Sequence, residues 1–135
     1  MVYITRREVF AASHRLFNPV LSDEENFKIY DKCSNPNGHG HNYILEVVVA
    51  GEVNPQTGYL LDLKDLKKII KEHVTDKLDH KNLNLDVDFL IGKITSSENI
   101  VMAIWDQLKD NLPAGKLYSV KLYETENNYV EYKGE

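Results

Sequence analysis

The sequence lacks most of the features that mark membrane, secreted and nucleic-acid-binding proteins. It contains one cysteine in 135 residues, so no disulfide can form within the chain, and we expect a reducing compartment, the cytosol. It has no run of about 18 apolar residues, and MVYITRREVF has no cationic segment before an apolar block, so we expect neither a membrane span nor a secretory signal. Acidic residues outnumber basic ones by 21 to 16, which argues against a nucleic-acid partner.

What is present is an ordinary globular composition, with 42% hydrophobic and 27% charged residues. A chain of this length suits one domain, and we expect residues 1–135 to form it. Four segments alternate in polarity or are rich in β-branched and aromatic residues, which predicts four strands. These segments are residues 2–16, 39–53, 116–125 and 128–133.

Two segments between the second and third strands carry apolar residues at helical spacing. The first helix is expected at residues 63–76 with Asp62 as its N-cap, and the second is expected to have Ser96 or Ser97 as its N-cap. Residues 18–37 lose both periods, and we interpret them as an excursion with one helical turn.

The element order β-β-α-α-β-β predicts an α+β fold, in which an antiparallel four-stranded sheet carries both helices on one face. Such a sheet leaves two edges without partners, and strands of this length are prone to pair with other chains. Oligomerisation into a closed barrel would remove both edges. We therefore expect the chain to assemble with copies of itself.

Three histidines form a candidate metal site. His39 and His41 stand two residues apart on one strand, so their side chains share a face, roughly 6–7 Å apart at the backbone. Antiparallel pairing of the first two strands would bring His14 beside them. Three imidazoles without a further obvious ligand are typical of a catalytic zinc, which keeps one position open. The alternative is a set of ordinary histidines near a turn, and His73 is given no role.

The single thiol, Cys33, lies six residues before His39 in the polar stretch DKCSNPNG. It is a fourth zinc ligand, a small buried hydrophobe or a reactive group. Its polar surroundings argue against burial, and a nearby zinc ion would stabilise its thiolate. The residues alone do not separate a ligand from a base.

Two further groups carry chemistry that the fold would have to support. In LDHKNL, the Asp79 carboxylate could orient the imidazole of His80, although a polar loop after the helix explains the same residues. Glu124 follows an apolar strand, and a buried carboxylate there needs a pair of donors. The two parallel N–H groups of a pterin or a purine would supply that pair, whereas a solvated glutamate at a strand end would need none.

Taken together, these pieces resemble the 6-pyruvoyl-tetrahydropterin synthase family of tunnelling-fold (T-fold) pterin enzymes. The resemblance extends over nearly the whole chain and keeps the order of the family's segments. The matching segments are FAASHRL, LSDEENFKIYDKCSNPNGHGHNY, LDHKNLN, SSENI and LYETENN.

The resemblance implies roles for individual residues. One catalytic Zn²⁺ per subunit would be bound by His14, His39 and His41. Proton transfer would fall to Cys33, Asp79 and His80, so Cys33 would not be a zinc ligand. The pterin ring would be anchored by Glu124, helped from a neighbouring subunit by Ser96, Ser97 and Glu98. The family commonly has threonine where this chain has Ser96, so these last contacts are the least firmly implied.

The resemblance also implies a reaction and an assembly. The family converts 7,8-dihydroneopterin triphosphate to 6-pyruvoyl-tetrahydropterin and triphosphate in tetrahydrobiopterin biosynthesis, as a carbon–oxygen lyase acting on phosphates. The sequence has no Gly-rich dinucleotide fingerprint, in keeping with a reaction that needs no nicotinamide or flavin. The implied assembly is a homohexamer of two stacked trimers, with active sites between subunits. Arg15, Lys32 and Lys81 are hypotheses for triphosphate contacts.

Two alternatives share the expected fold. The first is a 6-carboxy-tetrahydropterin synthase of the 7-deazaguanine pathway, which acts on the same substrate. Such enzymes tend to have a shorter spacer than the five residues between Cys33 and His39, and they usually lack an excursion such as LSDEEN. The second is a T-fold protein that binds zinc or a pterin without catalysis, against which the intact Cys33, Asp79 and His80 weigh.

Overall fold

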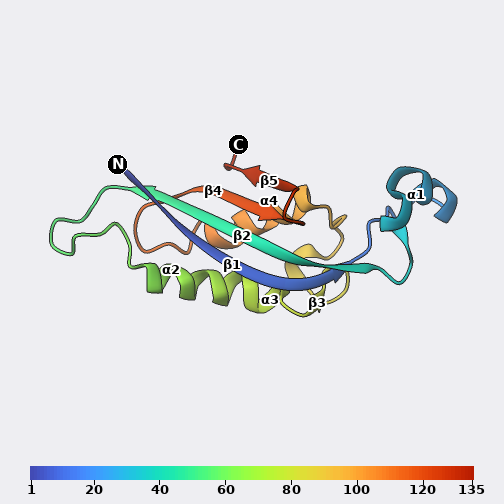
Figure 1. Cartoon of the computed structure of the whole chain (residues 1–135), viewed down its shortest axis with the longest axis horizontal. Helices are drawn as coiled ribbons and strands as arrows, with labels where there is room; N and C mark the ends of the chain where they lie inside the picture. The colour runs from blue at the N-terminus through green and yellow to red at the C-terminus, as the bar shows by residue number, and fades with distance from the viewer.

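A computed structural model describes all residues 1–135, and its centre is one mixed five-stranded sheet (Figure 1). The strand order is β3-β1-β2-β4-β5. The four long strands are antiparallel to their neighbours, and the short β3 runs parallel to β1. Their bounds are β1 Val2–His14, β2 His39–Gly51, β3 Lys81–Asn82, β4 Lys116–Tyr123 and β5 Tyr129–Tyr132. The α+β class is confirmed, but the expected count of four strands is wrong because β3 is too short to show any period.

The β1–β2 ladder sets the position of the histidines. The two strands pair without interruption along their lengths, from Val2 opposite Gly51 to His14 opposite His39. His41 lies opposite Ala12, so the end of one strand meets the start of the other, as expected from the sequence. Because side chains alternate between faces, all three histidines lie on the same face of the sheet.

The two helical stretches that follow β2 lie on that face of the sheet (Figure 1). A first helical stretch runs through α2 (Leu63–Ile70), a π-helical turn η2 (Lys71–Thr75) and α3 (Asp76–Leu78). The second is α4 (Ser97–Leu108), which packs against β4 and β5. Asp62 accepts a hydrogen bond from the backbone of Lys64, and Ser96 accepts one from Asn99, so both expected N-caps are confirmed.

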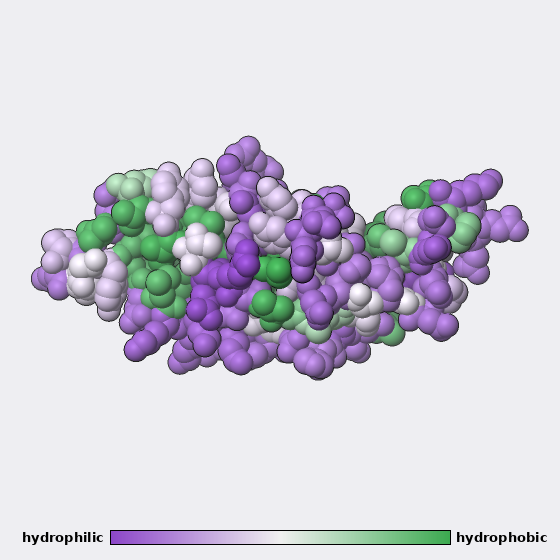
Figure 2. Space-filling view, viewed as in Figure 1, coloured by the Kyte–Doolittle hydropathy of each residue, from purple (hydrophilic) through white to green (hydrophobic).

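One core of 22 buried apolar residues fills the space between sheet and helices. Leu66, Ile70 and Val74 are fully buried from the first helical stretch, while Leu63, which shares their spacing, is half exposed. The other face of the sheet carries charged pairs such as Arg7 with Glu46. Figure 2 shows apolar side chains gathered toward the end of the sheet where β1 begins, with hydrophilic side chains farther along. No helix is long and apolar enough to cross a membrane.

The excursion between β1 and β2 stands beyond the end of the sheet (Figure 1). It holds α1 (Asp23–Tyr30) and the 3₁₀ helix η1 (Asp31–Ser34). Ser22 and Glu25 form a reciprocal capping box at the start of α1. The buried side chain of Asn26 bonds to the backbone of Asn18 in both directions, which closes the loop before the helix. A loop with such internal hydrogen bonds keeps its conformation without packing against the main core.

Candidate active site

Three imidazoles converge at the end of the β1–β2 ladder. One ring nitrogen from each of His14, His39 and His41 lies within 4.8 Å of the other two. The ring centroids are 4.7 Å apart for His14 and His39, 5.3 Å for His14 and His41, and 4.8 Å for His39 and His41. The register of the two strands produces this cluster directly.

His14 is fully buried and has a defined orientation. Its Nδ1 lies 2.8 Å from the carbonyl oxygen of Thr95, which can only accept, so Nδ1 carries the proton and Nε2 keeps its lone pair. Burial lowers the pKa of His14, and the neighbouring His39 and His41 lower it further, although the bond to Thr95 opposes them. The ring is therefore neutral at pH 7 and suited to metal binding.

His41 presents its Nε2 beside a carboxylate. Glu124 Oε1 lies 3.5 Å from that nitrogen, too far and too poorly aligned for a hydrogen bond. Burial lowers the pKa of His41, and the charge of Glu124 only partly offsets this effect. The net lowering of the pKa leaves a neutral imidazole next to an acidic side chain.

The donor set fits a metal ion. His14 Nε2 and His41 Nε2 are buried and have no hydrogen-bond partner in the chain, which is costly unless something else satisfies them. A metal ion satisfies both, with His39 as the third donor. Three imidazoles leave a coordination position open in a tetrahedral site. Cys33 is not a member of the cluster.

Glu124 and the Ser96–Glu98 segment share one hollow of about 300 Å³. Ser97 Oγ donates a 2.7 Å hydrogen bond to Glu124 Oε2, which fixes the carboxylate and leaves Oε1 toward the histidines. The sequence comparison with the family implied that this serine segment comes from a neighbouring subunit. Within the chain, Ser97 reaches Glu124 because α4 packs over β4 and β5, and the contribution of a neighbouring subunit stays a prediction.

Asp79 and His80 lie at the outer edge of β1. Asp79 Oδ1 accepts a 2.9 Å hydrogen bond from the Ala11 backbone, and Oδ2 lies 3.0 Å from His80 Nδ1. The two neighbouring side chains face each other because His80 has a φ of +62°, a conformation uncommon for residues other than glycine. The Ala11 N–H lowers the pKa of Asp79 most, with a further contribution from His80. The His80 ring is exposed, so its other nitrogen is open to a ligand.

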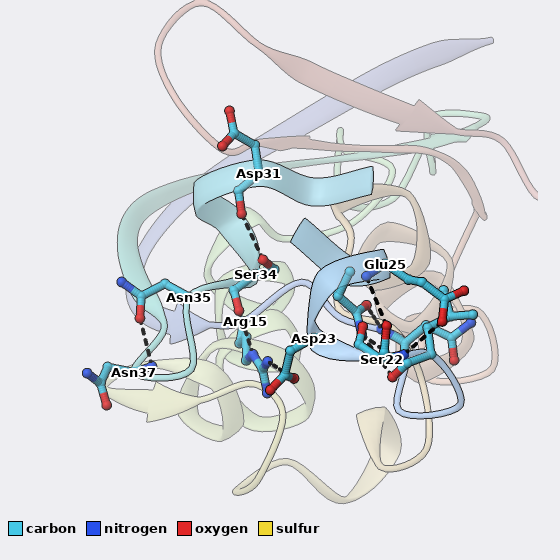
Figure 3. Close-up of polar contacts among 11 residues, drawn as sticks. Arg15, Ser22, Asp23, Glu25, Asp31, Ser34, Asn35 and Asn37 are labelled. Carbon is cyan, nitrogen blue, oxygen red and sulfur yellow. Dashed lines mark hydrogen bonds and ion pairs between the residues drawn. The ribbon is translucent and has the colours of Figure 1, made fainter. Parts of the chain in front are cut away.

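Cys33 lies beside the segment that follows the C-terminal end of β1. Backbone and guanidinium contacts hold it there. The Leu16 N–H donates to the Cys33 carbonyl at 2.8 Å, and Arg15 Nε donates to the Ser34 carbonyl at 2.8 Å. Figure 3 shows Arg15 between Ser34 and Asp23, whose carboxylate lies 3.7 Å from the guanidinium. Only the Nε donor is used in a hydrogen bond, so the terminal nitrogens of Arg15 remain free to donate and a triphosphate contact stays a hypothesis.

Some of the expected site residues line a common hollow, and others do not. A second hollow of about 600 Å³ is lined by both His41 and His80, and Lys81 lines it as well. Cys33 lines neither this hollow nor the one at Glu124. Within one chain, the thiol and the Asp79–His80 pair therefore line no common hollow.

Two groups of the site were not found from the sequence. The Thr95 carbonyl orients His14, but a backbone acceptor leaves no mark on the residue type. Tyr43 is fully buried beside the cluster, with its ring centroid 5.5 Å from that of His41, and burial raises its pKa. The signal was available, since Tyr43 has the same strand parity as His39 and His41.

Comparison with known proteins agrees with this architecture. A model of the family described as "6-pyruvoyl tetrahydropterin synthase" matches residues 3–135. The chain belongs to the 6-pyruvoyl tetrahydropterin synthase family. It is 53% identical to the 6-pyruvoyl tetrahydrobiopterin synthase of Homo sapiens over 132 residues, which are 98% of this chain and 91% of the human protein.

Two further proteins named as 6-pyruvoyl tetrahydropterin or tetrahydrobiopterin synthases are also similar to this chain in sequence or structure. The chain is 54% identical to the protein of that name from Dictyostelium discoideum, over 99% of this chain and 97% of the other. The structure of Caenorhabditis elegans 6-pyruvoyl tetrahydropterin synthase superposes with a TM-score of 0.93 at 41% identity, covering 99% of this chain and 96% of that one. The family and the T-fold expected from the sequence are therefore confirmed.

Proposed function

We propose that the chain converts 7,8-dihydroneopterin triphosphate to 6-pyruvoyl-tetrahydropterin and triphosphate, as a carbon–oxygen lyase of tetrahydrobiopterin biosynthesis in the cytosol. The observation that carries the proposal is the adjacency of two groups: a cluster of three histidines suited to a metal, and a carboxylate that Ser97 fixes next to His41. The metal cluster suits the reacting side chain of the substrate, and the carboxylate suits its pterin ring. The proposed unit is one T-fold domain, residues 1–135.

We propose zinc as the metal, one ion per subunit, held by His14, His39 and His41. Three imidazoles with one position open are the donor set that catalytic zinc prefers. When bound, zinc would polarise oxygens of the substrate side chain and so acidify the neighbouring C–H bonds. The Thr95 carbonyl supports this role because it fixes the protonated nitrogen of His14 away from the cluster.

Glu124 is proposed to bind the pterin ring. The ring presents two parallel N–H groups, and a carboxylate accepts both in a bidentate arrangement. Glu124 is only partly exposed and is already fixed by Ser97, so little side-chain freedom is lost on binding. Ser96 and Glu98 line the same hollow and are proposed as further contacts.

Proton transfer is proposed for Cys33 and the Asp79–His80 pair. The Cys33 sulfur accepts a proton from a side-chain carbon of the substrate. The electron pair of that C–H bond forms a C=C bond to the neighbouring carbon, whose C–O bond breaks as triphosphate leaves with the electron pair of that C–O bond. His80, oriented by Asp79 at 3.0 Å, exchanges protons with the substrate during the tautomerisation that follows. The Asp79 carboxylate stays ionised because the Ala11 N–H lowers its pKa.

A homohexamer of two stacked trimers is proposed as the active form. β1 has a neighbour on its outer side only at Ala12 and Ser13, and the outer edge of β5 is bare. Pairing of these edges between copies would close a barrel and satisfy the free backbone groups. Assembly would also place the active sites between subunits, where Cys33 and the Asp79–His80 pair are proposed to act on one substrate.

Product analysis tests the proposal. The zinc-loaded protein is incubated with 7,8-dihydroneopterin triphosphate, and released triphosphate and the pterin product are measured by chromatography and mass spectrometry. A retained pyruvoyl side chain is the expected result. Acetaldehyde with a 6-carboxy product would instead assign the chain to the 7-deazaguanine pathway, and binding without release of triphosphate would indicate a non-catalytic T-fold protein.

A further inference from the structure

Only three buried side-chain nitrogen or oxygen atoms of the chain lack a hydrogen-bond partner, and all three belong to one region. They are His14 Nε2, His41 Nε2 and the hydroxyl oxygen of Tyr43. Native proteins leave few such atoms because an unpaired buried polar group is destabilising. A metal ion at the histidines satisfies the two nitrogens, but the hydroxyl of Tyr43 is left over.

The position of Tyr43 is fixed by its neighbours. It follows His41 by two residues on β2, so it shares the face of the cluster. Its ring stacks on Phe10 at 5.0 Å with an angle of 12° between planes. The rings of His14 and His41 stand nearly edge-on to it, with centroids 6.2 and 5.5 Å away. The ring cannot turn away without disrupting this packing.

No group of the chain takes the hydroxyl hydrogen. Glu124 acts electrostatically on the hydroxyl, yet no hydrogen bond joins them. Glu124 Oε2 is taken by Ser97, and Oε1 lies toward His41. The aromatic rings packed against it belong to Phe10, His14 and His41. The hydroxyl is therefore available to an acceptor supplied by a bound ligand.

We propose that the Tyr43 hydroxyl donates a hydrogen bond to a hydroxyl oxygen on the side chain of the bound pterin, next to the three histidines. This inference rests on the proposed function. The ring would be recognised by Glu124 and the side chain by the metal together with Tyr43. Tyr43 is thus a residue that selects pterins carrying a hydroxylated side chain at the ring position nearest the metal.

Ligand binding to the zinc-loaded protein tests the proposal without turnover. The affinities of neopterin, which has a hydroxylated side chain, and of pterin, which has none, are measured by fluorescence quenching. Wild type is expected to prefer neopterin. Tyr43→Phe keeps the ring stacked on Phe10 and should reduce this preference about 3- to 10-fold, the range of one neutral hydrogen bond. Affinity for pterin and zinc content should stay unchanged.

A second measurement separates this role from a structural one. Removing an unpaired buried hydroxyl should raise the melting temperature of the metal-free protein by a few degrees, whereas loss of a structural hydrogen bond would lower it. Tyr118→Phe is the matched control, because Tyr118 is partly exposed and its ring contacts Tyr3. It should change neither the preference nor the melting temperature.

The outcomes are distinct. An unchanged preference in Tyr43→Phe overturns the proposal, whatever happens to the melting temperature. Equal weakening of both ligands also overturns it, because the hydroxyl would then act through Glu124 and the ring. A lower melting temperature would show a structural hydroxyl. Failure of the wild type to bind either pterin would instead contradict the proposed function itself.

Discussion

The two halves of the proposed site are built in different ways. The histidines and Glu124 project from long paired strands, and their orientation is set by contacts within the chain, such as His14 with Thr95 and Glu124 with Ser97. Cys33, Asp79 and His80 stand on the margins of the sheet, in a 3₁₀ helix and at the end of a helical stretch. The members of the first half contact one another within one chain, whereas Cys33 and the Asp79–His80 pair line no common hollow.

This difference separates binding from proton transfer. A metal and a ring need fixed donors, and strands in a continuous ladder hold side chains firmly. Groups that move protons at the margin can come from more than one copy of the chain. Changes in the first half should therefore abolish ligand binding, and changes in the second should reduce rate while binding survives.

The largest effect is expected from loss of a metal ligand. His41→Ala should release the metal and reduce turnover by about 10³-fold or more, because several kcal/mol of charge stabilisation is lost. Metal content by inductively coupled plasma mass spectrometry and triphosphate release provide the two readouts. His73→Ala is the matched control, since His73 does not belong to the cluster. A full complement of metal in His41→Ala would contradict the assignment.

Removal of the thiol should reduce rate and leave binding intact. Cys33→Ala is expected to lower kcat by about 10²- to 10⁴-fold, the usual contribution of a positioned proton-transfer group. Zinc content and the affinity for neopterin should be as in wild type, since Cys33 is outside the cluster. Undiminished turnover would remove Cys33 from the mechanism, and loss of zinc would make it a ligand.

The sequence predicted the first half of the site better than the second, for a physical reason. Alternation along a strand fixes the face of each side chain, so pairing of two adjacent strands placed His14 beside His39. The contact between Ser97 and Glu124 depends on how α4 packs over the sheet, which no local period encodes. β3 has two residues and hence no period, and the φ of His80, which turns its ring toward Asp79, has no glycine to mark it.

A smaller effect is expected at the carboxylate of the marginal half. Asp79→Asn keeps an oxygen for the Ala11 N–H but removes the charge that orients and stabilises a protonated His80. Turnover should fall about 10- to 100-fold, less than for Cys33→Ala, with little change in melting temperature. Asp79→Ala should lose the Ala11 bond as well and melt lower. Equal activity of Asp79→Asn and wild type would limit Asp79 to supporting the edge of β1.

A substitution at Arg15 should make the segment that carries Cys33 more mobile while leaving Cys33 itself unchanged. Arg15→Lys keeps the charge but loses the Nε donor to the Ser34 carbonyl and the fork that reaches Asp23. Turnover should fall about 3- to 10-fold while alkylation of Cys33 by iodoacetamide becomes faster, because the segment is less constrained. Arg7→Lys is the matched control, because Arg7 pairs with Glu46 on the opposite face of the sheet. Unchanged alkylation would show that the Leu16 contact alone holds the thiol.

The smallest effect is a pH dependence of stability in the metal-free protein. Burial lowers the folded-state pKa of His14 and His41, so the unfolded chain binds protons first as the pH falls below about 6.5. Stability should be greatest above that pH and fall as the pH approaches the folded-state pKa values. The melting temperature should therefore drop by a few degrees between about pH 7.5 and about pH 5.5.

His14→Gln should flatten this dependence, since it removes one buried group that must stay neutral, while His73→Gln should not. Bound zinc should also deepen the loss of stability at low pH, because protons compete with the metal for the imidazoles. A melting temperature of the metal-free protein that rises toward low pH would mean that the histidines gain protons on folding. That result would place the Glu124 charge, rather than burial, in control of the cluster.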